Sequence, residues 1–136
     1  MNKIFIIVFV VIIIVSCKEK DIKEKDYSTG IENIKENVSK DKITLFEAYE
    51  DANKIFRDLS ADTDLYNKTK GFIGDLALDM DNKTKTLFDQ KKYEEALNFG
   101  LSLKSIGFDS QIKLIDIYKH YLDEIDNSSD IFTINK

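Results

Sequence analysis

The chain has 136 residues, a formal net charge of −5 at pH 7 and 43% hydrophobic residues. The acidic balance argues against nucleic acid as a partner, because phosphate binding depends on clustered lysine and arginine. With a single cysteine the chain cannot form an intramolecular disulfide, so its folded part must be held together by its core.

The first seventeen residues form a segment of their own. Lys3 is followed by an apolar run from Ile4 to Val15, and then by Ser16 and Cys17. As a helix this run would reach about 18 Å, whereas the hydrocarbon core of a bilayer is about 30 Å thick, so the run is too short to span it. A basic start, a short apolar run and a small residue at the cut site predict a cleaved signal peptide over residues 1–16.

The end of this segment, Ile14-Val15-Ser16-Cys17, resembles the lipobox of bacterial lipoproteins. The resemblance implies cleavage between Ser16 and Cys17 and attachment of lipid to Cys17. It therefore implies a protein that is lipid-anchored to a bacterial membrane and faces the periplasm or the cell exterior. Stable anchoring needs about two acyl chains, which a diacylated cysteine supplies. The alternative is an uncleaved anchor or an ordinary signal peptide in which Cys17 is incidental.

Residues 17–42 are rich in Lys, Glu, Asp and Ser. Such a segment buries too little apolar surface to offset its ordering entropy, so it is predicted to be a flexible polar tether behind the lipid. An alternative comes from Ile31, Ile34 and Val38, which are spaced as on one face of a helix. A short amphipathic helix beginning after Gly30 would dock on the domain or lie on the bilayer, and docking or partial disorder is favoured because its polar face is not strongly basic.

A helical domain is expected over residues 43–126, where proline is absent and regular alternation is missing. A first helix is placed near Asp41 to Leu59, with Thr44 and Glu47 as a capping box. A second helical stretch from about Asp64 to Asp89 is either one helix or two, broken at the glycines of residues 71–74 or near residues 81–82. A domain of this length supports one modest core.

Two more helices follow in the pattern. One spans roughly Tyr93 to Ser105 and ends at Gly107, which accepts the left-handed conformation. The other is capped by Asp109 or Ser110 and runs to about Ile125. Its predicted buried face consists of Leu114, Ile117, Tyr118, Tyr121, Leu122 and Ile125. Residues 127–136 are expected to be a polar tail, so the predicted fold is an all-α, small antiparallel bundle of about four to five helices.

The segment from Leu87 to Leu97 resembles the middle of a tetratricopeptide repeat. Ala96 stands where that family has a small residue at the helix crossing, and Tyr93 stands where it has an aromatic. With the family period of about 34 residues, Leu114, Ile117 and Tyr121 fall at the positions where the next helix of the family has large residues. The resemblance covers about residues 77–126 and implies one repeat-like hairpin, since a repeat array needs about three units. The alternative is that Tyr93 to Leu97 simply begins a helix well.

The sequence points to no catalytic or metal chemistry. His120 is the only histidine and is expected at the surface, which leaves no partner set for a catalytic triad or a zinc site. A calcium loop beginning at Asp79 fails because Lys83 would stand in the fifth ligand position. Asp79 and Asp81 are therefore expected to be solvated surface or helix-end charges. We expect no enzyme activity, no cofactor and no metal.

Three aromatic residues fall outside the apolar stripes and are candidate interaction anchors, namely Tyr66, Phe99 and Phe108. Exposed aromatics often dominate binding energy at protein interfaces. The favoured hypothesis is a non-enzymatic module, tethered to the membrane through its N-terminal lipid, that binds a protein or peptide. The alternative hypothesis is a lipoprotein that holds a small or lipidic ligand in a pocket of the helical bundle.

Overall fold

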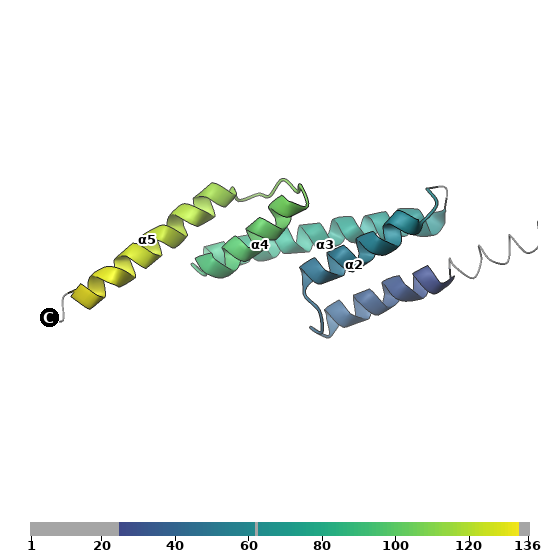
Figure 1. The fold of residues 1–136 in the computed structure, drawn as a ribbon, viewed down its shortest axis with the longest axis horizontal. Coiled ribbons are helices and arrows are strands. Elements are labelled where there is room, and N and C mark those ends of the chain that lie inside the picture. Colours follow the sequence, from purple (N-terminus) through teal and green to yellow (C-terminus); the bar gives the residue numbers. More distant parts are fainter. Residues whose placement is uncertain (1–24, 62, 134–136) are drawn as a thin grey trace, which may run out of the picture. The chain divides into compact units, whose positions relative to one another are not determined.

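The protein is described from a computed structural model that covers residues 25–61 and 63–133. Within these residues the chain forms a helix over residues 25–39, followed by α2 (Leu45–Asp58), α3 (Asp64–Asp89), α4 (Tyr93–Ser105) and α5 (Leu114–Thr133) (Figure 1). The expected all-α fold is confirmed. The predicted signal peptide, Ser16 and Cys17 lie outside the described residues.

The chain divides into two compact units, Met1–Ile73 and Gly74–Lys136. The boundary falls inside α3, which runs without a break from Asp64 to Asp89. The stretch that could have been one helix or two is therefore one, and both Gly71 and Gly74 are accommodated in it. Residues 64–73 of α3 therefore belong to the first unit and residues 74–89 to the second.

The first unit contains the helix over residues 25–39, where the polar tether was expected. Ile31 and Ile34 are 4% and 8% exposed, and a Cβ added at Gly30 would lie 2.9 Å from Ile55 Cδ1 of α2. The tether prediction is wrong for this segment because its spaced isoleucines bury one face. The alternative of a docked amphipathic helix describes it better, although the helix begins at residue 25 and not after Gly30.

The start of α2 is defined by its cap. The Thr44 backbone N–H donates to Glu47 Oε2 at 2.8 Å, and the Glu47 N–H donates to Thr44 Oγ1 at 3.2 Å, which completes the predicted capping box. The helix begins at Leu45 and not near Asp41, because Asp41 has a φ of 53° in the preceding turn. That left-handed conformation is incompatible with a right-handed helix.

The second unit is built from residues 74–89 of α3 together with α4 and α5. Its fully buried side chains include Met80, Leu103 and Ile117, and Leu87, Ala96 and Ile117 pack together from the three helices. At Gly100 an added Cβ would lie 3.0 Å from Leu114 Cδ1, so the missing side chain allows α4 and α5 to approach closely. The predicted helical hairpin is present, with α4 bounded as expected and Gly107 left-handed at a φ of 73°.

The boundaries of α5 differ from the prediction at both ends. Asp109 and Ser110 do not cap the helix, which begins at Leu114, because the loop before it is bonded to α3 through Ser110. At the other end α5 continues to Thr133, so residues 127–133 of the expected polar tail are helical. Residues 134–136 lie outside the described residues.

Candidate interaction groove between α4 and α5

The face of α5 that the sequence predicted to be buried is only partly covered. Ile117 is fully buried, but Tyr118 is 46% exposed, Leu122 41% and Ile125 41%. The prediction is wrong for these three residues because the described part of the second unit presents α4 and α3 to one side of α5 only. Apolar side chains are therefore left at the surface of this helix.

A shallow apolar hollow of about 300 Å³ lies between α4 and α5. It is lined by Leu97, Leu101, Lys104, Leu114, Ile115 and Tyr118. Leu101 is 49% exposed and Ile115 is 55% exposed, so the hollow is open and its walls are apolar. Lys104 is the only charged residue in its lining. We call this hollow the α4–α5 groove.

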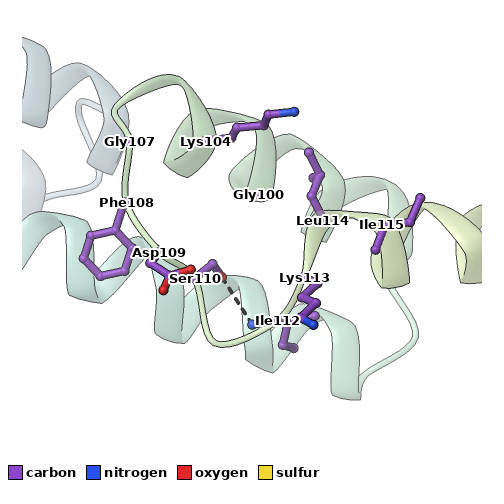
Figure 2. Close-up of a pocket in the computed structure, with 10 residues that line it drawn as sticks. All are labelled: Gly100, Lys104, Gly107, Phe108, Asp109, Ser110, Ile112, Lys113, Leu114 and Ile115. Atoms are coloured by element: carbon purple, nitrogen blue, oxygen red, sulfur yellow. Dashed lines mark hydrogen bonds between the residues drawn. The ribbon is translucent and has the colours of Figure 1, made fainter.

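A second hollow of about 410 Å³ adjoins the groove at the end where the chain passes from α4 to α5. Figure 2 shows its lining, which consists of Gly100, Lys104, Gly107, Phe108, Asp109, Ser110, Ile112, Lys113, Leu114 and Ile115. It shares Lys104, Leu114 and Ile115 with the α4–α5 groove. The two hollows therefore adjoin, and the charged residues that line them are Lys104, Lys113 and Asp109.

The loop that closes this end is held by Asp81 of α3. The Ser110 hydroxyl donates to Asp81, and the Gln111 N–H donates to Asp81 Oδ1 at 3.1 Å. Asp81 is 2% exposed, so the prediction that it is a solvated charge is wrong. A buried carboxylate needs donors, and the loop supplies them, which fixes the loop beside α3.

The predicted aromatic anchors are only partly exposed, and one of them reaches this surface. Phe108 lines the larger hollow, with its ring directed away from Leu114 (Figure 2). Phe99 packs against the buried cluster of the second unit. Tyr66 belongs to the first unit, where its ring centroid lies 4.5 Å from that of Phe56.

Sequence reasoning missed the residues that do line the groove, above all Leu101, Ile115 and Tyr118. A signal was present at the start of α5, where Leu114, Ile115, Ile117 and Tyr118 are all apolar. Four apolar side chains within five positions cover more of a helix than one buried stripe requires. Such a broad apolar arc indicates two contact faces.

His120 lies at the surface, as predicted, and joins a small aromatic cluster. Its ring stacks on Tyr93 with centroids 5.3 Å apart and an interplanar angle of 18°, and it meets the edge of Phe88 at 5.2 Å. This cluster links α5 to the start of α4 and to the end of α3. Its contacts explain how His120 stabilises the helix packing.

Comparisons with known proteins found no match to a family model, to a curated protein or to a solved structure. Among the described helices, none combines the length and the apolar character needed to cross a membrane. Within the same residues, no three His, Cys, Asp or Glu side chains gather as a metal site.

Proposed function

We propose that the protein is a bacterial lipoprotein that acts as a membrane-tethered interaction module without enzymatic activity. In this proposal Cys17 carries the lipid, and the helical part is held at the periplasmic or outer face of the membrane. The α4–α5 groove then binds a protein or peptide. The lipobox-like sequence at residues 14–17 supports the anchoring, and the groove supports the binding.

The observation that carries the proposal is the apolar exposure of the groove. Leu101, Ile115 and Tyr118 are each about half exposed on adjacent helices. Apolar side chains gain free energy when a partner removes them from water, at about 25 cal/mol per Å². Contiguous exposed apolar surface on a soluble domain typically marks an interaction site.

A tetratricopeptide-like hairpin is part of the proposal. Ala96 is fully buried, and Gly100 permits the close approach of α4 to α5. A repeat of this kind cannot bury its apolar face alone and needs a neighbouring unit. The open face of α5 stands where such a neighbour would pack.

The alternative of an internal ligand gains no support from the two hollows at α5, because both open onto the surface.

The test is chemical crosslinking in intact cells, followed by purification of the full-length chain from the membrane fraction. The wild-type chain should carry a specific crosslinked protein, and Leu101→Gln should reduce that product at least several-fold. Leu78→Gln is the matched control, because Leu78 is 48% exposed on α3 and does not line the groove. An equal yield of the product from all three chains would contradict the proposal.

A further inference from the structure

The α4–α5 groove sets two requirements on whatever covers it. Its lining is apolar along most of its length, so the occupant must present an apolar strip. Its one charge is Lys104, next to Leu114 and Ile115, and the adjoining hollow adds Lys113 and Asp109, which leaves this end with a net positive charge. The occupant must therefore carry negative charge at one end of its apolar strip.

The distal part of α5 meets both requirements. Leu122 is 41% exposed, and the acidic residues Asp123, Glu124 and Asp126 beside it are all exposed. This segment cannot reach the groove end of its own chain. Asp126 lies twelve residues beyond Leu114 on the same helix, which is about 18 Å along the axis. The distal part of α5 can therefore contact the lysine end of the groove only in a second copy of the chain.

From this match we infer that two copies of the chain associate through their α4–α5 faces, with the two α5 helices antiparallel. The inference rests on the proposed binding role of the groove and names a second copy as an occupant. A twofold axis near residue 120 places Tyr118 opposite Leu122 of the second copy, and it places the Lys104 end of the groove opposite Asp126. Symmetry makes each contact twice.

The spacing of the exposed residues supports this arrangement. Ile115, Tyr118 and Leu122 follow one another at intervals of three and four, which is the spacing of a seam between paired helices. The two α5 helices would pair over residues 114–126, and α4 has 13 residues, so each contributes a length of about 20 Å. A face two helices wide then measures roughly 400 Å². That value is about half of the roughly 800 Å² per partner of a standard interface, so a weak dimer that forms as concentration rises is expected.

The test is sedimentation of the full-length chain in mild detergent over a concentration series, with charge exchange at the two proposed contacts. The wild-type chain should dimerise. Lys104→Glu alone and Asp126→Lys alone should each weaken the dimer about tenfold or more, because each change creates two like-charge contacts. An equimolar mixture of the two variants should restore the dimer, since every contact across a mixed pair is again between opposite charges.

Lys83→Glu on the exposed surface of α3 is the control for net charge and should dimerise like the wild type. A chain that is monomeric at every concentration would overturn the inference, and so would a mixture that dimerises no better than the single variants. A monomeric wild type that still yields a crosslinked membrane partner sensitive to Leu101→Gln would refute the dimer and leave the proposed function standing. A dimer that responds to charge exchange, in cells where no other protein is crosslinked to the chain, would support the dimer and not the binding of another protein.

Discussion

At the scale of single residues, α3 buries two threonine hydroxyls that differ in their hydrogen bonding. Thr84 Oγ1 donates a hydrogen bond to the Met80 carbonyl at 2.9 Å, one turn earlier in the helix. Thr69 Oγ1 is equally buried, and no hydrogen-bond partner lies within reach of it among the described residues. A buried polar atom without a partner destabilises the folded state by about 1–3 kcal/mol.

Replacing each threonine by valine should therefore have opposite effects. Thr69→Val removes the unpaired hydroxyl at nearly constant shape and should raise the free energy of unfolding by about 1 kcal/mol. Thr84→Val is the matched variant and should lower it by about 0.5–1 kcal/mol, because it deletes a satisfied hydrogen bond. Chemical denaturation followed by circular dichroism measures both. A loss of stability in Thr69→Val would show that its hydroxyl is bonded.

At the scale of helices, the cap of α2 couples stability to pH. Hydrogen bonds from the Thr44 backbone N–H and then from its hydroxyl lower the pKa of Glu47 below the ordinary glutamate value. A lowered pKa means that the folded state prefers the ionised carboxylate. Its contribution to stability is therefore complete above the ordinary pKa and is lost as the pH falls through the lowered value.

Glu47→Gln should expose this dependence. The variant should have a lower free energy of unfolding than the wild type at pH 7. This difference in stability should shrink toward zero when the pH falls well below about 4, the ordinary pKa range of a carboxyl group. Thermal melting of both chains at a series of pH values measures the difference. Glu50→Gln is the control, because Glu50 is exposed on the same helix and has no part in the cap. A difference that does not vary with pH would contradict the assignment to the cap.

Local chemistry explains which helices could be predicted from the sequence. The α2 cap and the end of α4 follow from interactions within a few residues, namely the Thr44–Glu47 box and the left-handed Gly107. The start of α5 could not be predicted because it depends on Asp81, which lies 29 residues before Ser110 in the chain. The exposed face of α5 was also missed. Apolar spacing predicts that a helix face makes contact, but it does not identify the segment or molecule that covers the face.

At the scale of the whole molecule, the proposed attachment to the membrane depends on one side chain. Cys17→Ser cannot form the thioether to lipid, so the chain should shift from the detergent-dependent membrane fraction to the aqueous fraction. Ser16→Ala is the matched control, because it keeps a small residue before the cysteine and should remain in the membrane fraction. Fractionation of cells followed by immunoblotting measures the distribution. A Cys17→Ser chain that has lost residues 1–16 and still stays in the membrane fraction would refute the lipid anchor.

The far end of α5 has a consequence for the motions of the protein. Residues 122–127 are exposed in the second unit although they are helical. A single helical segment with little packing opens frequently, because short helices are only marginally stable in water. The amide protons of these turns should therefore exchange with solvent deuterium much faster than those around Leu103 and Ile117. Any molecule that covers this end of α5 will reveal itself as slowed exchange in these turns.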